Sequence, residues 1–146
     1  GTFVPAGSQF DALAALGKVF REAKSDILIV DPYLDEVVLT DFAPLVPEGV
    51  ALRLLADVFY VKPSLAPAVA RWVGQYAQSR PLEARLTPPK ALHDRAVFVD
   101  HQTVWTLTQS FRSFAVRSPA VIVRADDIAP LKLAAYEALW QVAVPT

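Results

Sequence analysis

The sequence predicts one α/β domain over residues 1–146, with a mixed, largely parallel sheet and helices on both of its faces. Three observations support this class. The length of 146 residues is the commonest size of a single domain. Helical and strand-like patterns alternate along most of the chain, which is typical of layered α/β structures. Residues 27–30 are wholly apolar, as expected for a strand that is covered on both faces.

Four segments have helical patterns. Ser8 precedes the first as a potential N-cap, and apolar residues at helical spacing then predict a helix over residues 9–24. A short helix is expected over 36–45, and another begins at Pro63-Ser64. The last covers 127–142, and we expect its inward face to consist of Leu131, Ala135, Ala138, Leu139 and Val142.

Six segments are predicted as strands, at residues 27–30, 50–56, 82–86, 96–99, 104–107 and 120–123. The segments 96–99 and 104–107 have the spacing of a hairpin. Trp72, Trp105 and Trp140 occupy periodic positions, so we interpret them as packing residues rather than as platforms for nucleic-acid bases.

Composition excludes several classes of protein. A chain that is 53% hydrophobic is not disordered, and no apolar run is long enough to span a bilayer. Cysteine is absent, which excludes disulfides and thiolate chemistry. The first residue is Gly1 and methionine is absent, so we expect a trimmed fragment of a longer protein, with a cytoplasmic location as the default.

The formal net charge of −1 conceals an uneven distribution of charge. Residues 1–60 carry a net charge of −5, residues 61–125 carry +6, and residues 126–146 carry −2. A basic segment of this kind can mark a half of the domain that binds anions, although charges dispersed over solvated faces would give the same totals.

His93 and Arg95 are two residues apart at the start of a predicted strand. In an extended segment their side chains point to the same side, and an imidazole beside a guanidinium suits a phosphate group. A surface histidine and arginine that merely flank a core strand remain the alternative.

The pattern His93-x-Arg95-x4-Asp100 resembles the HxKx4D signature of the phospholipase D superfamily, in an HxR variant. The apolar strand that ends in Asp31-Pro-Tyr33 is also similar to the first strand of bacterial single-motif domains of this family. The resemblance extends from about Phe10 to Trp140 and implies the phospholipase D-like fold.

The resemblance also implies a two-step phosphodiester reaction that needs no metal or other cofactor. His93 takes the place of the nucleophile, Arg95 would hold the non-bridging phosphate oxygens, and Asp100 would fix local structure or orient a histidine. The family takes its general acid from a second copy of the motif, which this sequence lacks. A complete site therefore requires a homodimer or a fused partner domain.

The sequence departs from the family where Gly-Ser-x-Asn is expected. Leu107 replaces the glycine and is expected to narrow the pocket, while Thr108 and Ser110 retain hydroxyl groups. Arg112 and Arg117 follow and would extend a phosphate-binding surface. Asp31 and Tyr33 are further candidates for substrate binding, although an aspartate before a proline is also a common turn former.

Two functions are therefore expected. The first is a phospholipase D-like phosphodiesterase, nuclease-type and dimeric, with nucleic acid favoured over lipid because no amphipathic membrane-binding helix is evident. The second is a catalytically degenerate module that binds nucleic acid or protein, or drives dimerisation, within a larger protein.

Overall fold

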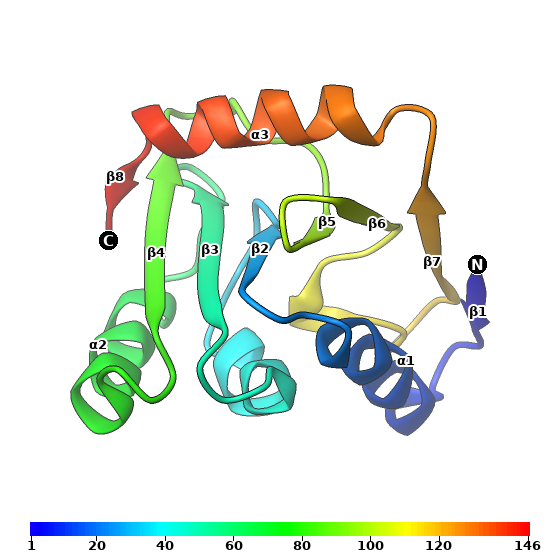
Figure 1. Cartoon of the computed structure of the whole chain (residues 1–146). Coiled ribbons are helices and arrows are strands. Elements are labelled where there is room, and N and C mark those ends of the chain that lie inside the picture. Colours follow the sequence, from blue (N-terminus) through cyan, green and yellow to red (C-terminus); the bar gives the residue numbers. More distant parts are fainter.

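The computed structural model describes residues 1–146 and contains one eight-stranded sheet with helices on both faces (Figure 1). The strands are β1 (Thr2–Val4), β2 (Asp26–Val30), β3 (Ala51–Asp57), β4 (Leu82–Thr87), β5 (Ala96–Val99), β6 (Thr103–Leu107), β7 (Ala120–Ala125) and β8 (Val144–Pro145). The long helices are α1 (Gln9–Arg21), α2 (Leu65–Tyr76) and α3 (Ala129–Val142). The mixed α/β class is therefore confirmed.

The strand order is β1-β7-β6-β5-β2-β3-β4-β8. Two neighbouring pairs, β2–β3 and β3–β4, are parallel, and the other five are antiparallel. The prediction of a largely parallel sheet is therefore wrong. Parallel neighbours need a long crossover connection, whereas β5, β6 and β7 follow one another without an α-helix between them.

The short elements differ most from the sequence-based expectations. Residues 38–45 form a π-helical turn followed by a 3-10 turn instead of a regular helix. Ser8 occupies the N-cap position of α1, but its side chain makes no capping hydrogen bond. The edge strands β1 and β8 have three and two residues, too few for a periodic pattern to reveal them.

The sheet separates two hydrophobic cores, as expected for a strand pattern that is apolar on both faces. Ile27 and Ile29 of β2 belong to the larger core, which includes residues of α1. Leu28 and Val30 belong to the smaller core beneath α3. All three tryptophans pack against these cores: Trp72 and Trp105 against the larger one, and Trp140 within the smaller one.

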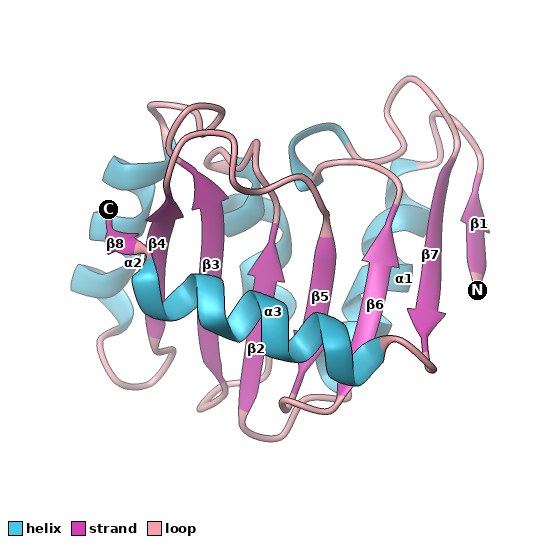
Figure 2. Ribbon diagram, turned by 90° about the horizontal axis from the view of Figure 1, so that it is seen from above, coloured by secondary structure: helices cyan, strands magenta, loops and turns pink.

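Helix α3 crosses the opposite face of the sheet from α1 and α2 (Figures 1 and 2). Its buried residues are Ala129 and Trp140, supported by Leu133, Tyr136 and Leu139. Of the five residues predicted to face inward, only Leu139 packs against this core, so that prediction is wrong for the other four. Apolar residues are distributed around most of the helix, and its periodicity therefore could not show which face would be buried.

The outer face of α3 is exposed and carries no charge. Leu131 is 73% exposed and Val142 is 66% exposed. The remaining exposed positions of the helix are Pro130, Ala134, Ala135, Ala138 and Gln141. The charged side chains Lys132 and Glu137 turn toward other elements, where they pair with Asp94 and Arg53. No helix of the protein combines the length and the apolar character that crossing a bilayer requires.

Candidate functional site

The candidate site lies at the edge of the sheet where β2, β3 and β4 end. Because β5 is antiparallel to β2, it begins at this same edge, and β6 therefore ends there. The connection from β6 to β7 also lies at this edge. Strand polarity alone thus brings together Asp31, Arg95 and residues 108–118, which are far apart in the sequence.

Asp31 lies directly after β2 and is fully buried. Its carboxylate accepts hydrogen bonds from the Tyr33 N–H (3.0 Å), the Ser110 hydroxyl (2.7 Å) and the Phe111 N–H (2.8 Å). Burial raises the pKa of Asp31, although these hydrogen bonds oppose the shift. Asp31 therefore joins the segment after β2 to the segment after β6, and it supports the site from beneath.

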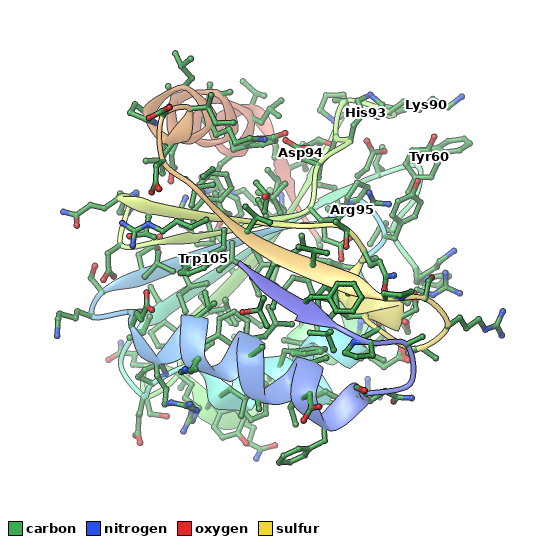
Figure 3. All side chains as sticks on the ribbon, turned by 90° about the vertical axis from the view of Figure 1, so that its right-hand side faces the viewer. Tyr60, Lys90, His93, Asp94, Arg95 and Trp105 are labelled. Carbon is green, nitrogen blue, oxygen red and sulfur yellow. The ribbon has the colours of Figure 1, made fainter.

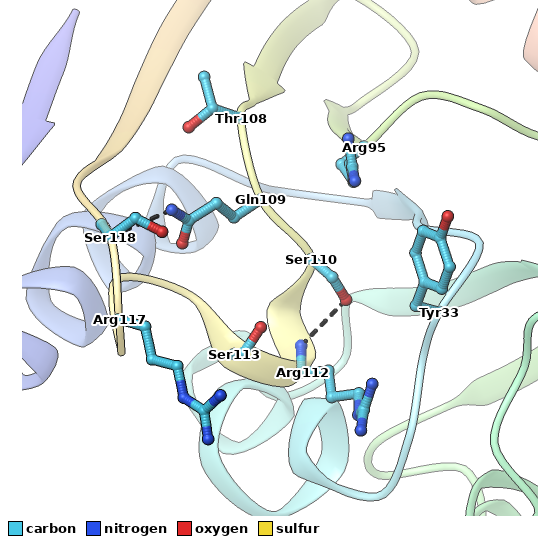
Figure 4. A pocket seen from close by; sticks show the side chains of 9 residues that line it. All are labelled: Tyr33, Arg95, Thr108, Gln109, Ser110, Arg112, Ser113, Arg117 and Ser118. Carbon is cyan, nitrogen blue, oxygen red and sulfur yellow. Dashed lines mark hydrogen bonds between the residues drawn. The ribbon is translucent and has the colours of Figure 1, made fainter. Parts of the chain in front are cut away.

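A cavity of about 350 Å³ opens above this anchor (Figure 4). Its lining contains three arginines, three serines and no carboxylate. The lining residues are Tyr33, Arg95, Thr108, Gln109, Ser110, Arg112, Ser113, Arg117 and Ser118. A concave surface with this excess of positive charge and of hydrogen-bond donors is suited to a phosphate or another oxyanion.

The three arginines differ in how they are held. Arg95 extends over the ring of Tyr33, with 5.7 Å between Cζ and the ring centroid, and its buried Nε has no hydrogen-bond partner. Arg112 is half exposed and its Nε lies 3.6 Å from the carboxylate of Asp35. Arg117 is exposed and forms no ion pair. Arg95 therefore lines the cavity with a guanidinium whose buried Nε is satisfied by no group of the protein.

Gln109, Ser113 and Ser118 also line the cavity but were not identified from the sequence. The Gln109 side chain accepts a hydrogen bond from the Ala115 N–H (2.8 Å) and donates to the carbonyls of Ser118 (3.1 Å) and Pro119 (2.9 Å). Gln109 thereby shapes the loop that carries Arg117. Its position within the four residues that replace Gly-Ser-x-Asn was the signal that could have revealed it.

The hydroxyl groups that were predicted to bind substrate already make hydrogen bonds within the protein. Ser110 donates to Asp31 and accepts from the Arg112 N–H (3.1 Å), while Thr108 accepts from the Val121 N–H (2.9 Å). Leu107 belongs to the larger hydrophobic core and does not line the cavity. The expectation that Leu107 narrows the pocket is therefore wrong, because its side chain is buried in this core.

His93 does not line the arginine cavity. It borders a separate, open hollow beside α3, together with Leu131, Ala135 and Tyr136. His93 and Arg95 lie in residues 91–95, which belong to no helix or strand, and the two side chains line different hollows. Figure 3 shows His93 at some distance from Arg95 along the same side of the molecule.

Two carboxylates explain the path of this loop. The buried Asp57 at the end of β3 accepts hydrogen bonds from the N–H groups of Lys90 (3.0 Å) and Leu92 (3.1 Å). Asp94 then accepts hydrogen bonds from the Lys132 ammonium and the Tyr136 hydroxyl of α3, both at 2.6 Å. These bonds draw the loop toward α3 and leave His93 exposed at the margin of the helix.

Asp100 lies at the other end of β5, away from the cavity. Its carboxylate accepts hydrogen bonds from the N–H groups of Lys24, Ser25 and Asp26 at 2.8–3.1 Å. Burial works to raise the pKa of Asp100, but these N–H groups and the Ser25 hydroxyl outweigh it and lower the pKa to about 2. Of the two roles that the family resemblance implies for this aspartate, its position suits the fixing of local structure.

The lowered pKa of Asp100 predicts a specific loss of stability in acid. Because the folded-state value of about 2 lies below the ordinary 3.8, the carboxylate stabilises the fold above pH 4, and this contribution disappears as the pH falls toward 2. We expect Asp100→Asn to lower the urea midpoint at neutral pH and to reduce the dependence of that midpoint on pH across this range. Asn tolerates the positive φ of 54° at this position.

Asp11→Asn, at an exposed position of α1, is the matched control and should follow the wild-type curve. If the Asp100→Asn protein lost stability in acid as steeply as the wild type, the stabilising role of this carboxylate would be refuted.

Comparisons with known proteins show the fold. The sequence matches no protein-family model and no curated protein. Nuc, a phospholipase D family member from Salmonella typhimurium, has a similar structure with a TM-score of 0.69 and 18% identity, covering 99% of this chain and 94% of that one. NucT from Helicobacter pylori has a TM-score of 0.69 and 12% identity, covering 99% and 98%.

A third similar structure is TrmBL2, an archaeal chromatin protein with a novel mode of DNA binding. Its TM-score is 0.59 at 15% identity, and the match covers 99% of this chain but 52% of that one. At these levels of identity the similarities establish a common fold and leave the activity to be argued from the site.

Proposed function

We propose that this chain, which has the fold of the phospholipase D family, is one subunit of a homodimeric phosphodiesterase that cleaves nucleic acid. One observation carries the proposal: three arginines and no carboxylate line a cavity at the edge of the sheet where the His93 loop also lies. Arginine grips two phosphate oxygens at once, so this lining suits a phosphodiester.

In the proposed reaction an imidazole nitrogen of His93 attacks phosphorus. An N–P bond forms, the bond from phosphorus to the leaving oxygen breaks, and that oxygen takes a proton from the imidazolium of His93 in the second copy. Water then attacks the phosphohistidine, gives a proton to the second imidazole, and breaks the N–P bond. Arg95 holds the non-bridging oxygens and offsets the charge that develops on them.

The exposed face of α3 supports a dimer as the source of the second histidine. The face carries no charge, and its residues are arranged nearly symmetrically about the middle of the helix. An antiparallel pair of α3 helices about a two-fold axis sets Leu131 against Val142 and Ala135 against Ala138, so large residues meet at the ends and small ones at the centre. Leu131 and Ala135 also border the hollow that contains His93, and docking here would place the second copy beside that residue.

The test uses bis(p-nitrophenyl) phosphate in the presence of EDTA. We expect the wild-type protein to hydrolyse it and Arg95→Ala to lower kcat/KM by about 10²- to 10³-fold, since a charged group that stabilises the transition state is lost. Arg95→Lys restores the family's usual residue and should recover part of the rate. Arg71→Ala, at an exposed position of α2, is the matched control. Equal rates for Arg95→Ala and wild type would refute the proposal.

A second function, an anion-binding module without catalysis, is favoured by the position of His93 outside the arginine cavity. The similarity in fold to a DNA-binding chromatin protein is compatible with it. In that case the wild-type protein would bind inorganic phosphate or DNA and lose this affinity in Arg95→Ala, but no variant would turn over the diester. The same set of proteins therefore separates the two functions.

A further inference from the structure

A row of aromatic side chains, exposed at one end and partly buried at the other, leads to the arginine cavity. Phe59, in the turn after β3, is 61% exposed and packs edge-on against Tyr60, with 5.0 Å between ring centroids. Tyr60 in turn contacts Tyr33 at 4.9 Å, and Tyr33 lines the cavity beneath Arg95. We call Phe59, Tyr60 and Tyr33 the aromatic platform. It connects the exposed turn after β3 directly to the phosphate-binding candidates.

Buried hydrogen bonds hold this platform in place. Asp57 accepts from the Phe59 N–H (2.9 Å), and Asp31 accepts from the Tyr33 N–H (3.0 Å). Each aspartate ends a parallel strand and fixes the aromatic residue two positions later in the same way. Burial works to raise the pKa of Asp57, but the N–H groups of Lys90, Phe59 and Leu92 outweigh it and lower the pKa, so Asp57 stays ionised as an acceptor.

A cation accompanies the exposed ring. Asp57 binds the Lys90 N–H through the same oxygen that binds Phe59, and the Lys90 ammonium lies 4.7 Å from the Phe59 ring centroid. Lys90 adopts a positive φ of 62°, an uncommon conformation for a residue with a side chain, which these contacts maintain. Figure 3 shows Tyr60, Lys90 and Arg95 on one side of the molecule. Aromatic rings therefore lie next to cations along this edge.

We propose that the aromatic platform stacks the unpaired bases of a single-stranded nucleic acid whose phosphodiester backbone enters the arginine cavity. The inference rests on the proposed function for the phosphodiester nature of the ligand, and it adds the class of strand. Aromatic rings beside a basic groove are the usual means of binding single strands, because every base offers a flat face. Paired bases are stacked on one another within a duplex and cannot use such a platform.

The test measures binding by fluorescence anisotropy at one fixed salt concentration, with every protein carrying His93→Asn so that the probes are not cleaved. The probes are an oligothymidylate of about ten nucleotides, an abasic strand with the same number of phosphates, and a duplex of equal length. We expect Phe59→Ala to weaken binding of oligothymidylate by about 5- to 100-fold and to leave binding of the abasic strand unchanged. Phe3→Ala, which removes a phenylalanine that is 64% exposed on β1, is the matched control.

Two outcomes would overturn the proposal. An equal loss of affinity for the oligothymidylate and the abasic strand would mean that Phe59 acts through the fold or through charge. Duplex binding as tight as single-strand binding would mean that the platform does not contact bases. Hydrolysis of bis(p-nitrophenyl) phosphate does not require the aromatic platform and therefore tests the proposed function separately. A failure of the platform proposal is thus distinguishable from a failure of the proposed phosphodiesterase function.

Discussion

His93→Asn is expected to abolish phosphodiester hydrolysis while anion binding persists. The variant removes the proposed nucleophile and the proposed acid together, so we expect kcat to fall by about 10⁴- to 10⁶-fold. Phosphate affinity should remain, because His93 does not line the arginine cavity. Hydrolysis of bis(p-nitrophenyl) phosphate and titration with inorganic phosphate measure the two effects. A combined loss of both would mean that His93 also contributes to binding of the anion.

The chain supplies a matched control for this substitution. His101, the only other histidine, lies at the opposite edge of the sheet between the carboxylates of Asp26 (3.5 Å) and Glu137 (3.2 Å). His101→Asn should hydrolyse the diester at the wild-type rate, and asparagine tolerates the φ of 56° there. If His93→Asn and His101→Asn had the same activity, His93 would have no part in the chemistry.

Ala135→Glu is expected to separate the subunits and remove activity. Glutamate is a good helix former, so α3 should persist. In the proposed antiparallel pair, however, a carboxylate would be buried among apolar residues near its symmetry mate, at a cost of several kcal/mol. A monomer lacks the second histidine, and the loss of a general acid lowers the rate by about 10²- to 10⁴-fold.

Sedimentation velocity and the diesterase assay measure these two effects on the same sample. Ala70→Glu, at an exposed position of α2, is the control and should remain dimeric and active. A wild-type protein that is monomeric at micromolar concentration yet fully active would exclude the composite site.

The local sequence pattern made most of the helices and strands predictable. The strand at Ala96–Val99 has the predicted bounds, and most of the other long elements differ by only a few residues, because their apolar periodicity is strong. Six of the nine predicted site residues line one cavity: Tyr33, Arg95, Thr108, Ser110, Arg112 and Arg117. They lie at the ends of strands that meet at one edge, so the topology unites them.

Contacts between residues that are distant in the sequence determined the arginine cavity, the aromatic platform and the orientation of His93. The arginine cavity requires the Gln109 side chain to shape the loop that carries Arg117. The aromatic platform requires Asp57 to bind residues that are 33 and 35 positions away. The orientation of His93 depends on hydrogen bonds from α3 to Asp94. None of these contacts leaves a periodic trace in the sequence.

Two predictions came from the sequence by itself. The length predicted one domain, and the motif predicted half of a two-histidine site. The tertiary structure decided which surfaces remain free. Helix α3 has apolar residues on most of its sides, and the sheet can cover only one side. The choice of the buried face left an uncharged face beside His93. Burial of apolar area is not directional, which is why the sequence predicted the helix and packing alone determined its exposed side.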